Sequence, residues 1–170
     1  MKNNELFNLF MDELKDMLST ENQIIAALPK MIKLASINEL KEALTNHLEE
    51  TKGQVTRLKT IFSILGEKPT EITCEGMQGI LAEGDEIVKG KTKSSLLDAA
   101  IISAAQKVEH YEIASYGTLR SFAKQLELDS EIAKLLQASL DEEGAADKKL
   151  TKIADGSFFT TGVNKVAAGK

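Results

Sequence analysis

Apolar residues recur every three or four positions along almost the whole chain, and this repeat constrains the fold more than any other feature. It covers residues 3–35, 37–65, 94–127 and 129–154, with a shorter stretch at 74–89, and it is the pattern of amphipathic helices. Only two prolines interrupt the 170 residues. We expect one of them, Pro29, to kink the first helix without ending it, because apolar residues continue beyond it. The sequence therefore predicts an all-α protein.

The lengths of the connections predict the topology. Helices one and two, and likewise helices three and four, are separated by so few residues that each pair must form an antiparallel hairpin. About 27 residues separate the two hairpins and include a fifth, short helix of about 16 residues, whose length of about 24 Å we expect to span the bundle lengthwise. The prediction is a four-helix bundle over residues 5–154 with one long crossover, which is the ferritin-like arrangement. Residues 155–170 contain three glycines among small polar residues, which predicts a flexible C-terminal tail.

Charge and cysteine content exclude several functions. Acidic residues number 26 against 21 lysines and arginines, giving a net charge of −5, which argues against nucleic acid or an anionic membrane as a partner. The single cysteine, Cys74, rules out an intrachain disulfide and a thiolate zinc site. No apolar run approaches the length of a membrane span and no signal peptide is recognisable, so we expect a cytoplasmic protein.

Several acidic residues fall where a helical bundle should be apolar. At 100° per residue, Glu21 lies in the middle of the apolar stripe of the first helix. Glu143 and Asp147 occupy consecutive inward positions in the last long helix. The stripe of the third long helix contains Glu109 and Glu112. Acids therefore face inward from three of the four helices.

The second helix gives a weaker signal. His47 and Gln54 lie at the edge of its stripe, and Glu50 is about 120° from Leu44, so it needs a rotated helix to point inward. Glu21, Glu50, Glu109 and Glu143 nevertheless lie within about two residues of their helix midpoints, at one level along the bundle. Tyr116 shares the stripe of the third helix, and we interpret it as a hydrogen-bond partner of the carboxylates.

Buried carboxylates must be protonated, pair with cations or bind metal, because an isolated buried charge costs several kcal/mol. No lysine or arginine lies at the centre of these stripes. Two divalent ions would supply the positive charge, and carboxylates with some imidazole suit iron or manganese. Di-iron bundles use Glu-x-x-His on two helices. Here the positions three residues after Glu50 and Glu143 are Gly53 and Ala146, so both histidines of that motif are missing.

Two segments resemble a known family. The run AAQKVEHYEIASYGTL at residues 104–119 and HLEET at 47–51 closely resemble the YciE/YciF-type family of ferritin-like bacterial stress proteins. The resemblance implies a rubrerythrin-related helical domain, usually a homodimer, with no firmly established reaction. It marks the same positions that the helical wheels select, namely Glu21, His47, Glu50, Gln54, Glu109, Glu112, Glu143 and Asp147.

Two functional hypotheses follow. In the first, the chain is a di-metal protein that handles oxygen or peroxide and binds up to two iron ions, or manganese instead. Glu109 and Glu143 would bridge the metals, Glu21, Glu50, Glu112 and Asp147 would complete the set, and His47 would be a ligand or its hydrogen-bonding partner. No rubredoxin-like cysteine motif identifies a redox partner. In the second, the chain is a non-catalytic stress or interaction protein whose site is empty. An iron-storing cage is disfavoured, because nothing in the sequence predicts a multimeric shell.

Overall fold

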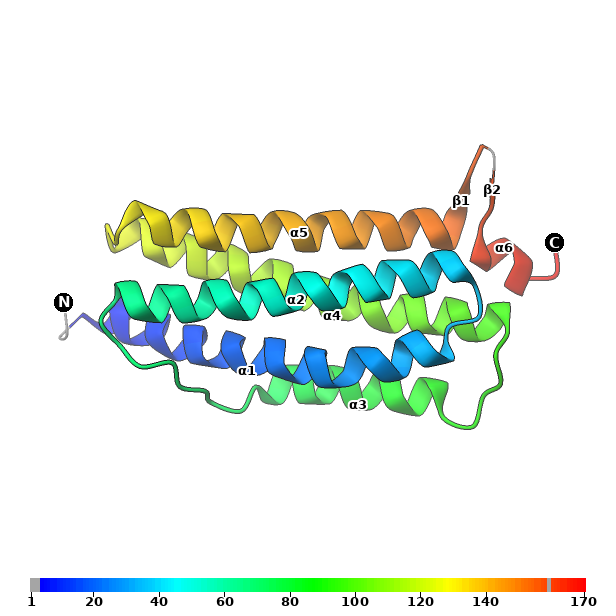
Figure 1. Cartoon of the computed structure of the whole chain (residues 1–170), viewed down its shortest axis with the longest axis horizontal. Coiled ribbons are helices and arrows are strands. Elements are labelled where there is room, and N and C mark those ends of the chain that lie inside the picture. Colours follow the sequence, from blue (N-terminus) through cyan, green and yellow to red (C-terminus); the bar gives the residue numbers. More distant parts are fainter. Residues whose placement is uncertain (1–3, 159) are drawn as a thin grey trace.

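The computed structural model describes residues 4–158 and 160–170 and confirms the four-helix bundle with a crossover helix (Figure 1). The elements are α1 (Glu5–Leu34), α2 (Asn38–Ile64), α3 (Glu75–Val88), α4 (Ser95–Gln125), α5 (Ser130–Asp155), β1 (Gly156–Ser157), β2 (Thr160–Thr161) and α6 (Val163–Ala167). Each of the five predicted helices begins and ends within two residues of its expected position.

Local signals in the sequence explain where the long helices begin. The side chains of Asn4, Ser94 and Asp129 each accept a hydrogen bond from a backbone N–H in the first turn of the helix that follows, which satisfies donors that otherwise lack a partner. As expected, α1 continues through Pro29. Caps as well as apolar faces thus define α1, α4 and α5, whereas α2 follows Ile37 without a side-chain cap.

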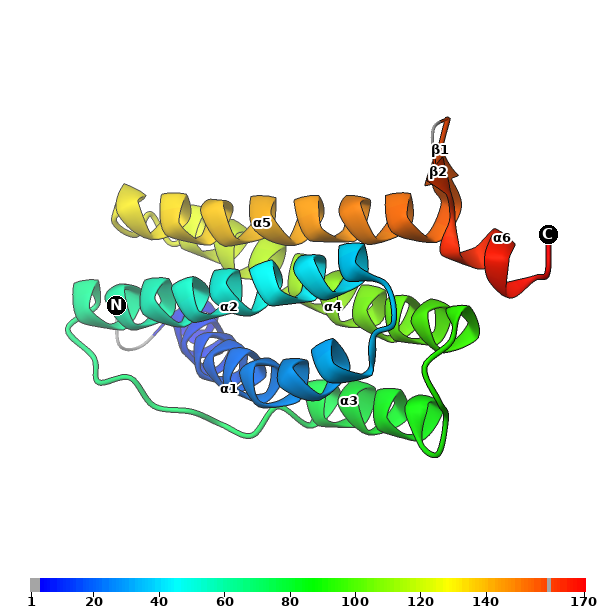
Figure 2. The same cartoon turned by 45° about the vertical axis from the view of Figure 1, so that its right-hand side comes forward.

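The four long helices pack in a closed ring. α1 contacts α2 and α4, and α5 contacts the same two helices from the other side. The crossover returns the chain to the end at which α2 began, so α2 and α4 run in the same direction (Figure 1). α3 lies outside the ring against α1 and α4, on the side of the bundle away from α5 (Figure 2).

The crossover helix is shorter than the bundle it crosses. At 1.5 Å per residue, the 14 residues of α3 extend about 21 Å, whereas the 30 residues of α1 extend about 45 Å. The extended segment 65–74 covers the remaining length (Figure 1). The prediction of a lengthwise crossover therefore holds for the whole connection and is wrong for the helix alone.

Buried apolar side chains form two separate clusters, one in each half of the bundle. Leu28 and Ile101 belong to the cluster that also includes α3, and Leu14 and Leu58 belong to the other. Between the clusters, all four long helices contribute buried polar side chains. The bundle core is therefore apolar, polar and apolar again along its axis.

The described residues of the predicted tail, 155–158 and 160–170, form short elements of secondary structure. β1 and β2 pair antiparallel, and Val163 at the start of α6 is 5% exposed and joins one apolar cluster. A Cβ atom on Gly162 would lie 2.2 Å from the carbonyl carbon of Asp155, and Gly156 has a φ of +83°. These two glycines therefore allow a close backbone approach that no other residue permits.

Asp98, in the first turn of α4, connects that helix to the turn between α1 and α2. It is fully buried and accepts hydrogen bonds from the Ser36 backbone N–H at 2.7 Å and from the Ser36 hydroxyl. We expect Asp98→Ala to lower the free energy of unfolding by about 2–3 kcal/mol, because charged hydrogen bonds are lost and the Ser36 donors lose their acceptor. Denaturant unfolding monitored by circular dichroism measures this loss.

Asp85→Ala is the matched control for that change. Asp85 is exposed and pairs with Lys30 at the surface, so its removal should cost less than about 1 kcal/mol. An equal decrease in the free energy of unfolding for the two variants would show that Asp98 does not stabilise the turn between α1 and α2.

Candidate metal centre

One histidine and three glutamates meet in the polar layer between the two apolar clusters. They are His47 from α2, Glu109 and Glu112 from α4, and Glu143 from α5, and one ligand atom from each lies within 4.8 Å of the others. None of the four residues is more than 5% exposed. Because the three helices supply the groups from different sides, the cluster encloses a small volume in the middle of the bundle.

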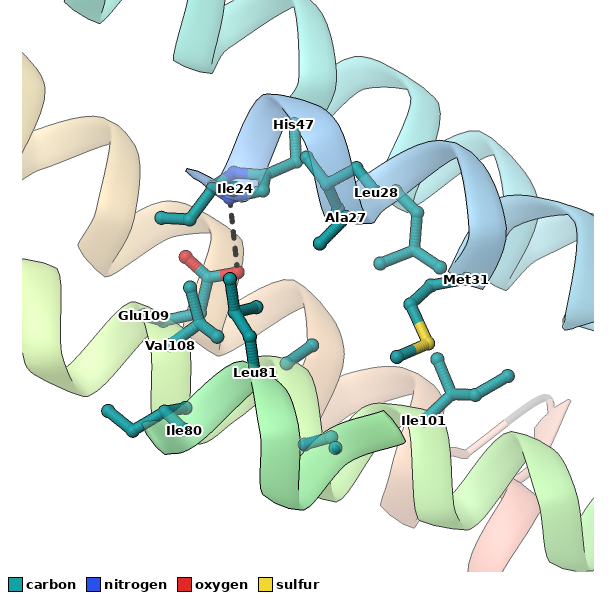
Figure 3. Close-up of a pocket in the computed structure, with 14 residues that line it drawn as sticks. Ile24, Ala27, Leu28, Met31, His47, Ile80, Leu81, Ile101, Val108 and Glu109 are labelled. Atoms are coloured by element: carbon teal, nitrogen blue, oxygen red, sulfur yellow. Dashed lines mark ion pairs between the residues drawn. The ribbon is translucent and has the colours of Figure 1, made fainter. Parts of the chain in front are cut away.

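His47 and the two glutamates of α4 are the closest part of this cluster. The His47 Nε2 atom lies 3.5 Å from Glu109 Oε1 and 4.0 Å from Glu112 Oε2. Figure 3 shows the His47 ring directed from α2 toward the Glu109 carboxylate. Glu109 and Glu112 share one face of α4 because residues three apart are neighbours on a helix surface.

Two further residues hold carboxylates of the layer by hydrogen bonds. The Tyr116 hydroxyl donates to Glu21 Oε1, and both side chains are fully buried. The Gln54 amide donates to Glu143 Oε1 and, at 3.1 Å, to Glu142 Oε2. Glu21 thus lies in the same layer as the cluster, with one of its oxygens occupied by Tyr116.

Three sequence-predicted ligands lie outside the four-residue cluster. Glu21 is buried in the same layer and bound by Tyr116, whereas Glu50 and Asp147 lie at the edge of the layer. The Glu50 side chain is 44% exposed, and its Oε2 atom is 3.9 Å from His47 Nδ1. Asp147 is partly buried and accepts a hydrogen bond from Gln106 Nε2 at 2.9 Å, while His110 Nε2 lies 3.4 Å from the same Asp147 oxygen. In this structure Glu50 and Asp147 therefore flank the centre, and neither joins the four clustered residues.

Burial and mutual repulsion act on the acids of the layer. Burial raises the pKa of Glu21, Glu109 and Glu112 well above the ordinary value of 4.5. The negative charge of Glu143 raises the pKa of all three further. Without a compensating cation, these groups favour their protonated form.

Several polar atoms in the layer have no hydrogen-bond partner among the residues that the structure describes. They include both ring nitrogens of His47, both oxygens of Glu112, and the Oε2 atoms of Glu21, Glu109 and Glu143. Buried polar atoms are normally satisfied. Carboxylate oxygens with one imidazole form a donor set that suits iron or manganese. The residues present therefore fit a metal ion.

A polar cavity of about 110 Å³ connects this layer to the bundle surface. It lies among α2, α4 and α5, and it reaches His47 and Glu109 from a rim that includes Asn46, Glu50 and Lys149. The rim carries the exposed acid Glu50 and the exposed base Lys149, so the cavity offers a polar path to the centre.

The helical wheels missed an arginine beside the layer. Arg57 pairs with Glu142 and donates to Ser139 Oγ at 3.0 Å. Its positive charge opposes the rise in the pKa of Glu21 that burial causes and that Glu143 increases. Arg57 lies one helical turn after Gln54, at the edge of the apolar stripe of α2 and not at its centre. That i, i+3 spacing is the signal that could have identified it.

Together, the fold and the site define an all-α bundle protein with a buried carboxylate–histidine layer. The chain matches the family described as "Domain of unknown function (DUF892)" over residues 5–166. It is 42% identical to protein YciF of Escherichia coli strain K12 over 164 residues, covering 96% of this chain and 95% of YciF. The chain therefore belongs to the DUF892 family, and the resemblance to YciF-type proteins is confirmed.

Two solved structures share the fold. The crystal structure of the E. coli stress protein YciF matches with a TM-score of 0.83 and 41% identity, covering 88% of this chain and 94% of that chain. YcfI from Rhodopseudomonas palustris, described as a candidate structural protein, matches with a TM-score of 0.85 and 43% identity, covering 89% and 96%. None of the helices that the structure describes is long and apolar enough to cross a membrane.

The raised pKa values predict how the stability of the metal-free protein depends on pH. At pH values between 4.5 and the raised pKa values of these glutamates, the folded protein binds more protons than the unfolded chain. The stabilisation is therefore complete below about pH 4.5 and is lost as the pH rises through the raised pKa values. In the presence of a chelator, we therefore expect the free energy of unfolding to fall as the pH rises above about 4.5.

Glu112→Gln should reduce this pH dependence, because the amide keeps the shape of the side chain without the titration. Glu86→Gln is the control, since Glu86 is exposed and pairs with Lys89 at the surface. Denaturant unfolding at several pH values tests the prediction. A stability that rises with pH, or an equal effect of the two variants, would contradict it.

Proposed function

We propose that this protein holds two divalent metal ions, with iron as the resident metal, in the layer formed by His47, Glu109, Glu112 and Glu143. The observation that carries the proposal is the set of buried nitrogen and oxygen atoms without partners that these residues turn toward one another. Two ions would bring positive charge to a place where burial and repulsion now favour protonated carboxyls.

The residues of the layer have different roles in this proposal. Glu109 and Glu143 belong to the same cluster, on the neighbouring helices α4 and α5, and would be shared between the ions. Gln54 orients Glu143, and Tyr116 orients Glu21, each by donating a hydrogen bond. The two apolar clusters close the layer at both ends along the bundle axis.

Iron bound here would supply one-electron chemistry toward oxygen or peroxide, so we propose a protein that handles one of these oxidants during stress. The stress connection rests on the relationship to YciF, which is described as a stress protein. The ferritin-like relationship and a homodimer remain proposals that rest on the family resemblance.

Metal analysis tests the proposal directly. Protein prepared without chelator and titrated anaerobically with iron(II) should bind up to two ions per chain, and Glu109→Gln should lose at least one of them. Glu49→Gln is the matched control, because Glu49 is exposed on α2 and pairs with Lys52. Absence of bound metal in the wild type, or unchanged binding in Glu109→Gln, would contradict the proposal.

The second candidate function is a non-catalytic stress or interaction protein with protonated carboxyls in the layer. It is favoured by the raised pKa values, which allow the acids to remain neutral, and YcfI is described as a candidate structural protein.

Glu143→Leu distinguishes the two candidates. In the proposed metal protein, free metal at about a hundred times its dissociation constant stabilises the wild type by about 2.7 kcal/mol, and Glu143→Leu should lose most of this gain. In the non-catalytic protein, metal should change the stability of neither form, and the leucine should be neutral or stabilising. Thermal unfolding with and without metal measures both effects.

A further inference from the structure

A second cavity reaches the metal centre from the side opposite the polar one. It has a volume of about 40 Å³ and lies between α1, α3 and α4. His47 and Glu109, which also line the polar cavity, form its inner end (Figure 3). The two cavities therefore come from opposite sides and both end at His47 and Glu109.

The walls of the second cavity are aliphatic. Its inner part is lined by buried side chains such as Leu28, Leu44 and Val108, and its outer part by partly exposed ones from α1 and α3, which are Met31, Ile80 and Leu81. Figure 3 shows Leu81 extending from α3 toward Glu109, with Met31 and Ile101 further along the same space. The crossover helix thus forms one wall of an apolar path to the centre.

The chemistry of these walls selects what the cavity can hold. A buried water molecule needs two to four polar partners. The aliphatic walls offer none beyond the inner end that His47 and Glu109 form, so the length of the cavity disfavours water, ions and hydrogen peroxide. Apolar cavities in proteins instead take up small apolar molecules such as xenon. One water-sized sphere needs roughly 10–15 Å³, so the volume admits a molecule of two or three atoms.

We propose that this apolar cavity is a binding site for dioxygen. The proposal rests on the proposed function and deepens it, because it names dioxygen as the oxidant that reaches this side of the metal centre. Dioxygen is apolar and diatomic, and it would lie beside the edge that His47 and Glu109 form. Ions and peroxide would approach through the polar cavity that Glu50 flanks.

Two glycines of α3 provide a matched pair of variants. A Cβ atom on buried Gly84 would lie 3.4 Å from Ala104 Cβ and 3.8 Å from Met31 Cε, so Gly84→Ala places a methyl group in the cavity without a severe clash. A Cβ atom on exposed Gly79 would meet nothing within 4 Å. Alanine favours a helix over glycine at both positions, so both variants should fold.

The test uses methyl-labelled, metal-free protein in chelator and measures NMR relaxation under dioxygen pressure, with nitrogen at the same pressure as the diamagnetic reference. The paramagnetic gas should enhance relaxation of the Leu28 and Leu81 methyl groups beyond that of Leu58, which is fully buried in the other cluster. Gly84→Ala should lose this excess, and Gly79→Ala should keep it.

Cavity methyl groups that respond no more than those of Leu58, or an excess that survives in Gly84→Ala, would overturn the proposal. Because the protein is metal-free in this experiment, the result does not depend on the metal centre. A positive result in a protein that fails the iron titration would leave the dioxygen site standing and reject the proposed function alone.

Discussion

The burial of four glutamates and one histidine in the middle of an apolar bundle is the constraint on which the rest of the structure depends. Glu21, Glu109, Glu112 and Glu143 are each at most 1% exposed, and ionised carboxylates in such a place cost several kcal/mol each without compensation. The two apolar clusters stabilise the helices on either side of this layer, and Tyr116 and Gln54 satisfy single oxygens within it. The remaining partnerless atoms account for our proposal of a metal pair.

The position of α3 makes the two sides of the centre different. The long helices alone would surround the layer symmetrically, but the crossover returns along α1 and α4 and covers that side with aliphatic residues. The side between α2 and α5 keeps Glu50 and Lys149 at its rim. The crossover that joins the two hairpins therefore also gives the metal centre one apolar side, while the other side stays polar.

Periodicity predicted the helices and the inward-facing acids because both depend on angles within a single helix. The positions of Glu50 and Asp147 depend on neighbouring helices, since Glu50 remains at a cavity rim and Asp147 is bound by Gln106 of α4. The ion pair of Arg57 with Glu142 also joins two helices, although the spacing of Arg57 from Gln54 is visible within α2. The C-terminal residues were predicted as a tail because glycine composition does not distinguish a mobile segment from a close backbone approach.

Anomalous X-ray diffraction at the iron absorption edge, from crystals grown with iron(II) under anaerobic conditions, tests the central claim most directly. We predict two anomalous peaks within the bundle, in contact with Glu109 and Glu143 and bordered by His47 and Glu112. Iron found only at surface carboxylates, or no anomalous signal between the two apolar clusters, would contradict the account.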